Sequence, residues 1–376
     1  MNTWLEALGG ASAADRESYR PVIFRPSDPS DRSRLEALLK HNRCITLHDQ
    51  LHAQLRELVK AMQPSVRWES EALDEAAIAH LKGQDPSLYG TWVHFPWSNR
   101  LVHLLDEAEF ALVRTDRNRN KITREEQALL ASKRIGIIGL SVGNSAALAL
   151  ALERGFGELR LADFDTLDLS NLNRIRSGVH HLGVNKVVNT AREIAEIDPY
   201  LKVTAFTEGI QDNNLEAFLT EGGKLDLLIE ECDSVAVKIS ARLAAKAHRI
   251  PVIMDTSDRG LIDVERFDLE PDRPILHGLV EGEHGLGALN DSNPGLRMAI
   301  ALRIVPLEQM SSQMRDSLPL IGKELSTWPQ LGSEVLHGGA AASYIGRKLL
   351  LGAGINSGRQ HFDLDDWAPT SETTKS

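Results

Sequence analysis

Short apolar segments alternate with helix-forming segments between residues 134 and 255, and this alternation restricts the possible folds most strongly. The run IGIIG at 135–139 has no polar side chain, which is typical of a parallel strand covered on both faces. The helical segment SAALALALERG that follows is apolar almost all round, so it is also expected to be buried. The pattern predicts a doubly wound, mainly parallel α/β sheet, in which ligands bind beyond the carboxyl ends of the strands.

The other expected elements of this sheet follow in order. Strands are predicted at ELRLADFD (158–165), LKVTAF (201–206), LDLLIEE (225–231) and PVIMD (251–255). Helices are predicted at KVVNTAREIAEID (186–198) and VAVKISARLAAKAH (235–248), and Gly155 is expected to end the first helix in a left-handed turn. After Asp255, LIDVERFDLE and PILHGLV are predicted to be antiparallel strands, 295–351 to be mainly helical, and FDLDDW to return to the sheet edge.

Residues 1–110 are expected to form a separate N-terminal α+β region whose role the sequence does not reveal. LHAQLRELVKAM (51–62) keeps helical apolar spacing, and TWVHFPWSNRLVHLL (91–105) has the pattern of a β-hairpin. The prolines of RPSDPSDR (25–32) predict an arm or loop. We therefore divide the chain into 1–110, a catalytic-type α/β domain at 111–367 and a disordered tail at 368–376.

Composition limits the functional classes. The chain has 42 basic and 53 acidic side chains, and its net charge of −11 disfavours binding to a nucleic-acid backbone. Cys44 and Cys232 are its two cysteines, so it has neither a disulfide framework nor a CxxC pair for zinc. The acidic N-terminus lacks a signal-peptide pattern, and no apolar run approaches the roughly 20 residues that span a bilayer. A cytoplasmic protein without membrane segments is expected.

Small residues fill the turn between the first strand and its helix. They are Gly139, Ser141, Gly143 and Asn144. Such residues allow backbone N–H groups at a helix N-terminus to approach a phosphate. Compared with GxGxxG, the second and third glycines are replaced by Ser141 and Asn144, and an ordinary tight turn is an equal alternative.

Charged residues follow the second strand in close succession. Asp163 stands 24 residues after Gly139, where dinucleotide-binding folds place the acid that accepts ribose hydroxyls, and Asp165 comes next. Asn171, Arg174 and Lys186 follow. A simple dinucleotide site needs no such cluster, whereas a triphosphate needs cations to neutralise a departing pyrophosphate.

The segments IGIIGLSVGNS, GFGELRLADFDTLDLSNLNR and ECD together resemble the adenylation domain of the ThiF/MoeB/E1-like activating enzymes. This superfamily includes the ubiquitin-activating enzymes and their bacterial relatives. The resemblance covers roughly residues 114–280, and LHGGAAASYIGRKLL resembles the family's late helix. It implies a Rossmann-like adenylyltransferase that uses ATP and Mg²⁺. The chain would be a divergent member, because it lacks the CxxC zinc ligands and an obvious catalytic cysteine.

The resemblance also implies roles for single residues. Asp163 matches the carboxylate that holds the ATP ribose, and Asp233 matches the aspartate associated with Mg²⁺ and pyrophosphate departure. Asn171, Arg174 and Lys186 match the groups on the triphosphate. In RTDRN (114–118), Arg117 matches an arginine that reaches the phosphate site of a partner subunit, which implies a homodimer.

Several alternatives stay open at this point. The activated carboxylate could belong to a carrier-protein C-terminus, a peptide or a small molecule. Similar proteins with such an N-terminal extension are associated with a flavin-dependent, nitroreductase-like region, which could here be a separate partner. The competing functions are an NAD(P)-dependent oxidoreductase and a non-catalytic E1-like scaffold or regulatory subunit. Cys232 follows an apolar strand, so we interpret it as a core residue rather than a nucleophile.

Overall fold

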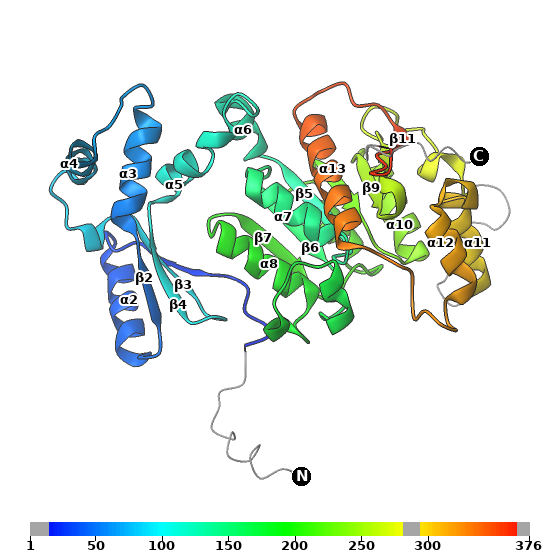
Figure 1. The fold of residues 1–376 in the computed structure, drawn as a ribbon, viewed down its shortest axis with the longest axis horizontal. Helices are drawn as coiled ribbons and strands as arrows, with labels where there is room; N and C mark the ends of the chain where they lie inside the picture. The colour runs from blue at the N-terminus through cyan, green and yellow to red at the C-terminus, as the bar shows by residue number, and fades with distance from the viewer. Residues whose placement is uncertain (1–14, 281–293, 367–376) are drawn as a thin grey trace, which may run out of the picture. The chain divides into compact units, whose positions relative to one another are not determined.

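The computed structural model describes residues 15–280 and 294–366 (Figure 1). The chain divides into two compact units, Met1–Lys121 and Ile122–Ser376, which we describe separately. The predicted tail at 368–376 lies outside the described residues. No helix among those described is long and apolar enough to cross a membrane.

The first unit contains a four-stranded sheet in the order β1-β3-β4-β2. The predicted hairpin is confirmed, because β3 (Thr91–Phe95) pairs with β4 (Arg100–Leu104) in antiparallel register. β1 (Val22–Phe24) pairs antiparallel with β3, and β2 (Thr46–Asp49) pairs parallel with β4. The helices are α2 (Pro29–His41), α3 (Leu51–Met62), α4 (Ser70–His80) and α5 (Glu107–Arg114), with short 3₁₀ turns η1 (Pro86–Leu88) and η2 (Asp116–Asn118).

The prediction of an irregular arm at 25–32 is wrong. Helix α2 begins at Pro29, and the side chain of Asp28 accepts hydrogen bonds from the backbone N–H groups of Ser30 and Asp31. Proline is well suited to the first helical position, because the N–H that it lacks would have no partner in the helix there. Pro29 therefore starts a regular element instead of preventing one.

The second unit is built on a seven-stranded sheet in the order β11-β10-β9-β8-β5-β6-β7. Its five parallel strands are β5 (Arg134–Ile138), β6 (Glu158–Ala162), β7 (Lys202–Phe206), β8 (Leu227–Glu230) and β9 (Val252–Thr256). β10 (Leu261–Glu265) and β11 (Gly358–His361) continue the sheet in antiparallel fashion. The expected fold class, mainly parallel with antiparallel C-terminal strands, is confirmed.

Helices cover both faces of this sheet (Figure 1). One apolar core includes residues of α7 (Gly143–Glu153), α8 (Lys186–Ile197) and α13 (Gly332–Leu350). The other includes residues of α9 (Leu215–Thr220), α10 (Val235–Ala247) and α11 (Pro294–Ile304). The remaining helices and 3₁₀ turns are α6 (Arg124–Leu130), α12 (Ser312–Ser317), η3 (Leu169–Asn173), η4 (Val179–His181), η5 (Asp258–Gly260), η6 (Ile275–Gly278), η8 (Leu307–Gln309) and η9 (Leu318–Leu320).

Three local predictions in this unit need correction. The left-handed residue after α7 is Arg154, with φ of +53°, because the bond from Gly155 N–H to the Leu150 carbonyl requires that conformation one residue earlier. PILHGLV forms the 3₁₀ turn η6 instead of a strand, with Leu276 and His277 left-handed. The edge strand β11 ends at His361, so the described part of FDLDDW, residues 362–366, follows the strand that it was expected to form.

The chain reverses its direction of strand addition at β5. From β5 it proceeds to β6 and β7 on one side, and then returns to place β8 and β9 on the other. Crevices at the carboxyl ends of strands form at such a switch point. The turn after β5 and the residues after β8 therefore meet at one edge, which we call the carboxyl edge.

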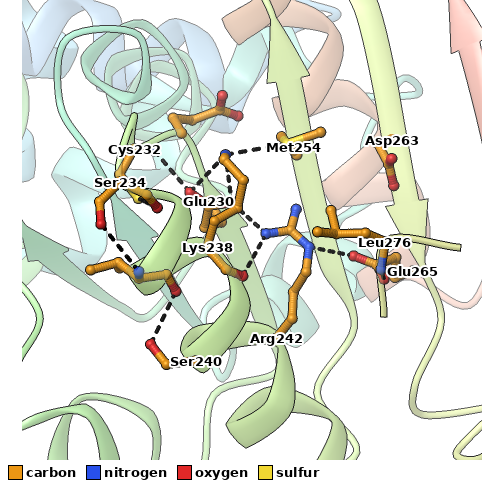
Figure 2. A network of polar contacts seen from close by, with 12 residues as sticks. Glu230, Cys232, Ser234, Lys238, Ser240, Arg242, Met254, Asp263, Glu265 and Leu276 are labelled. Atoms are coloured by element: carbon orange, nitrogen blue, oxygen red, sulfur yellow. Dashed lines mark hydrogen bonds and ion pairs between the residues drawn. The ribbon is translucent and has the colours of Figure 1, made fainter. Parts of the chain in front are cut away.

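A network of buried charges lies below this edge (Figure 2). Arg242 of α10 contacts Glu230 of β8 and donates from Nε to Glu265 Oε2 of β10 at 2.6 Å. Lys238 donates to Glu230 Oε2 at 2.9 Å. Burial acts to raise the pKa of Glu230, but Lys238 and Arg242 outweigh it and lower the pKa to about 2. The network fixes β8, α10 and β10 to one another.

The substitution Arg242→Met tests this network. It leaves two buried carboxylates with one cation fewer, so we expect a loss of about 3–5 kcal/mol in the free energy of unfolding by urea titration. Lys202→Met is the control, because Lys202 pairs with Glu158 at 3.0 Å but is 65% exposed, and it should change the free energy by less than about 1 kcal/mol. Equal losses of unfolding free energy for the two substitutions would contradict the conclusion that the Arg242 network holds these elements together.

Candidate functional site

The turn after β5 requires glycine at two positions. Gly139 has φ of +86°, and a Cβ there would lie 2.7 Å from the Cys232 backbone nitrogen. A Cβ on Gly143 would lie 2.6 Å from Cγ2 of Ile137, so this glycine brings α7 close to β5. The N-cap residue of α7, Val142, makes no side-chain capping hydrogen bond. The first backbone N–H groups of the helix are thus placed at the carboxyl edge in the way that anion sites use them.

Asp163 closes this turn from the end of β6. Its Oδ2 accepts a hydrogen bond from Leu140 N–H at 2.7 Å, and its Oδ1 accepts one from Asp165 N–H at 2.9 Å. Burial raises the pKa of Asp163, against the opposing effect of Lys186 and the two backbone donors. Because a carboxylate has about four acceptor positions, two backbone bonds leave capacity for hydroxyl groups of a ligand.

Lys186 links the glycine turn to the acidic strand end. It is the first residue of α8, is 6% exposed, and donates from Nζ to Asp165 Oδ2 at 2.8 Å and to Ser141 Oγ at 3.3 Å. Three predicted site residues, Ser141, Asp165 and Lys186, are therefore in direct contact. The ammonium group lies beside the turn that precedes the α7 N-terminus.

Arg174 directly follows η3 and Asp233 lies in the turn after β8, and the two side chains are near enough for their charges to interact. Burial lowers the pKa of Arg174, and the nearby charge of Asp233 opposes this effect. Nε of Arg174 is buried and has no hydrogen-bond partner in the described part of the chain. Asp233 is exposed, and Ser234, rather than Asp233, caps α10 by accepting from Val237 N–H. The Asp233 carboxylate is therefore available for a ligand, and the Arg174 guanidinium keeps a donor that no described residue satisfies.

Asn171 and Asn144 have internal partners. Asn171 Oδ1 accepts a hydrogen bond from Asp168 N–H at 2.9 Å, which closes the first turn of η3. Asn144 donates from Nδ2 to Thr190 Oγ1 and Glu193 Oε2, both at 3.0 Å, so its side chain joins α7 to α8 instead of pointing along the carboxyl edge. A contact between the Asn144 backbone, at the helix N-terminus, and the nucleotide stays a prediction.

Arg117 lies in η2 of the first unit. Arg119, the residue after RTDRN, pairs with Asp116 at 3.2 Å. The role of Arg117 at a partner's phosphate site stays a prediction.

A pair of buried acids lies at the same edge, and sequence reasoning overlooked one of them, Glu231. Ile229 of β8 pairs with Ile253 of β9, and two residues further Glu231 and Asp255 stand side by side, with Glu231 Oε1 accepting from Asp255 N–H at 2.9 Å. Glu231 Oε2 and both carboxylate oxygens of Asp255 have no hydrogen-bond partner among the described residues. Burial raises the pKa of both carboxyl groups above their usual values, and for Glu231 the neighbouring charge of Asp255 adds to the effect. The second glutamate of LLIEECDS, at the end of an apolar strand, was the available signal for Glu231.

Cys232 is held in an environment that suppresses thiolate formation. Burial raises the pKa of its thiol, and the neighbouring charge of Glu230 adds to this effect. Because the thiolate is the nucleophilic form, this environment is unfavourable for thioester chemistry.

The fold and this edge together define a Rossmann-like α/β domain with a helix N-terminus, a lysine and an arginine gathered at its switch point. Residues 115–281 match the ThiF family, and this part of the chain is a ThiF family domain. The resemblance drawn from the sequence is thereby confirmed.

Three relatives illustrate the similarity. Protein MT1398 of Mycobacterium tuberculosis (strain CDC 1551 / Oshkosh) is 43% identical over 273 residues, which are 73% of this chain and 38% of that protein. The molybdopterin-synthase adenylyltransferase of Escherichia coli (strain K12) is 30% identical over 43% of this chain and 64% of its own length. The tRNA threonylcarbamoyladenosine dehydratase of Bacillus subtilis (strain 168) is 30% identical over 41% and 60%. The chain thus spans less than two thirds of each relative.

Solved structures with a related arrangement have low sequence identity. The E. coli tRNA N6-threonylcarbamoyladenosine dehydratase TcdA has a TM-score of 0.46 and 17% identity, covering 66% of this chain and 97% of TcdA. The E. coli MccB structure with ATP has a TM-score of 0.45 and 13% identity, covering 80% of this chain and 79% of MccB.

Two glycine substitutions test the turn after β5. Gly139→Ala combines a left-handed backbone with a Cβ contact at 2.7 Å, whereas Gly222→Ala has φ of +69° and open space around it. A left-handed alanine alone costs about 1–2 kcal/mol, and the forced contact should add about 1–3 kcal/mol to the loss for Gly139→Ala. Chemical unfolding of both variants measures the difference. Equal losses of stability would mean that the close approach of Gly139 to the turn after β8 is unimportant.

Proposed function

We propose that the second unit is an ATP-dependent adenylyltransferase that activates a substrate carboxylate. The observation that carries this proposal is the position of Lys186 and Arg174 at the carboxyl edge of a ThiF family domain, beside an uncapped helix N-terminus. The similarity to proteins named molybdopterin-synthase adenylyltransferase supports the same activity. The ATP phosphates would lie between these three groups, and the ribose would bind at Asp163.

The reaction would proceed by displacement at the α-phosphate. A carboxylate oxygen of the substrate attacks the α-phosphorus, the bond to the bridging oxygen breaks, and pyrophosphate leaves with the bonding electron pair. Negative charge moves onto the pyrophosphate, so fixed cations near it lower the barrier. Lys186 and Arg174 would supply that charge, and Asn171 would fix the segment that carries Arg174.

Mg²⁺ would neutralise phosphate charge in this site when bound. Asp233 suits the ion, because its carboxylate is exposed and not used as a helix cap. The described residues contain no group of three His, Cys, Asp or Glu side chains arranged to hold a metal ion. Binding would therefore depend on Asp233 together with the nucleotide phosphates, as is usual for Mg²⁺ at phosphoryl sites.

The raised pKa of the Cys232 thiol bears on the acceptor side of the proposed reaction. A carrier-protein C-terminus, a peptide or a small carboxylate would be activated, and an amine or sulfur donor would complete the reaction. Because the pKa of Cys232 is raised, we propose transfer directly from the adenylate rather than through an enzyme thioester. A homodimer with Arg117 reaching the partner's phosphate site, and a separate flavin protein as a partner, belong to the same proposal.

ATP binding distinguishes this function from its competitors. Arg174→Gln removes the charge of a guanidinium whose Nε has no partner in the described structure, and it should weaken ATP–Mg²⁺ binding by at least about tenfold in isothermal titration calorimetry. Arg124→Gln, on the exposed surface of α6, is the charge-matched control and should leave the affinity unchanged.

Other binding results would reject the proposal. Tight binding of NAD(P) with no binding of ATP would favour the oxidoreductase. A wild-type protein that binds neither nucleotide would favour the scaffold. Equal ATP affinities of Arg174→Gln and the wild type would remove Arg174 from the phosphate site.

A further inference from the structure

The side chain of Asn173 connects the guanidinium of Arg174 to the chain segment that enters α13. Its Oδ1 accepts a hydrogen bond from Arg174 Nη1 at 2.9 Å, and its Nδ2 donates to the Gln330 carbonyl at 2.8 Å. The two residues joined to Asn173 are 156 positions apart in sequence, counted from Arg174 to Gln330. One amide group thus links the proposed phosphate arginine to a distant element.

The chemistry of the two partners fixes the orientation of this amide. A guanidinium can only donate, and a backbone carbonyl can only accept. The reversed amide would bring two donors together on one side and two acceptors on the other, losing both hydrogen bonds. Asn173 therefore holds Arg174 in one direction, and an aspartate or an alanine could not make the same pair of contacts.

Helix α13 makes matching contacts with the proposed phosphate helix α7. Ser145, in the first turn of α7, shares its one hydroxyl proton between the Val142 carbonyl at 2.7 Å and the Val335 carbonyl of α13 at 2.9 Å. A Cβ on Gly339 would lie 2.0 Å from the same Oγ. A Cβ on Gly332 would lie 2.8 Å from the Asn173 carbonyl oxygen. The first turns of α13 therefore touch both the start of α7 and the segment that carries Arg174.

We propose that Asn173 is a positioning residue for Arg174, through which α13 fixes the spacing between the guanidinium and the N-terminus of α7. The inference deepens the proposed function, because it assumes that these two groups bind the same triphosphate. It also explains the second glycine of the GG pair in LHGGAAASYIGRKLL, since Gly339 allows α13 to approach Ser145.

A role in general stability predicts different behaviour. Asn173 is exposed, and hydrogen bonds at exposed positions contribute little to the free energy of unfolding. A positioning residue should change ATP affinity while the unfolding midpoint stays near that of the wild type. Its effect should also disappear when Arg174 is replaced, since Asn173 acts through that side chain.

A double-mutant cycle tests this coupling. Asn173→Ala should weaken ATP–Mg²⁺ binding by about three- to tenfold in the wild-type background, and by less than about 1.5-fold in the Arg174→Gln background. Asn214→Ala is the matched control, because the Asn214 amide also accepts one hydrogen bond, here from Gln211 N–H at 2.8 Å, and donates one to a carbonyl, that of Gly209, at 2.8 Å. It should leave ATP affinity unchanged in both backgrounds.

A second variant tests the contact between Asn173 and α13 from the α13 side. Gly332→Ala should weaken ATP binding in the same direction as Asn173→Ala, and Gly354→Ala, which meets open space, should not. The inference would be overturned if Asn173→Ala reduced ATP affinity equally in the wild-type and Arg174→Gln backgrounds. It would also be overturned if Asn173→Ala bound ATP with wild-type affinity. A wild-type protein that binds no ATP would instead contradict the proposed function. Equal ATP affinities of Arg174→Gln and the wild type would remove only the role of Arg174 and this inference, so the two failures are distinguishable.

Discussion

The carboxyl edge depends on the charge pair between Arg242 and Glu230. Glu230 accepts hydrogen bonds from Lys238 and Arg242, and its Oε1 also accepts one from Cys232 N–H at 2.9 Å. The same carboxylate therefore joins the buried network to the turn after β8. That turn lies against Gly139, where any side chain would collide with it. The buried charge network of β8, α10 and β10 thus determines where the glycine turn and the residues around Asp233 meet.

Positive charge at the edge is held in two different ways. Lys186 is buried and paired with Asp165, so its place is fixed before any ligand arrives. Arg174 is half-buried and held by the neutral amide of Asn173 at 2.9 Å. A neutral partner orients a guanidinium without neutralising its charge, so a phosphate does not have to displace a carboxylate from it. The fixed lysine and the oriented arginine together suit an anion with several phosphate groups.

Much of this arrangement could be predicted because it depends on local sequence. Apolar runs identified the parallel strands, and the spacing from Gly139 to Asp163 placed the acid at the end of β6. Long-range contacts decided the rest. Asp255 lies against Gly338, where a Cβ would be 1.9 Å from Oδ2, and Asn173 bonds to the segment before α13. Neither contact has a signature within a short window. Arg154 and Leu276 adopt left-handed conformations that their residue types do not favour, so sequence pattern alone placed a glycine turn and a strand there.

A crystal structure of the protein with ATP and Mg²⁺ tests the central claim most directly. The account predicts the triphosphate at the N-terminus of α7, with phosphate oxygens within hydrogen-bond distance of Lys186 and Arg174, the ribose at Asp163 and Mg²⁺ beside Asp233. A nucleotide bound elsewhere, or one whose phosphates contact neither Lys186 nor Arg174, would contradict it.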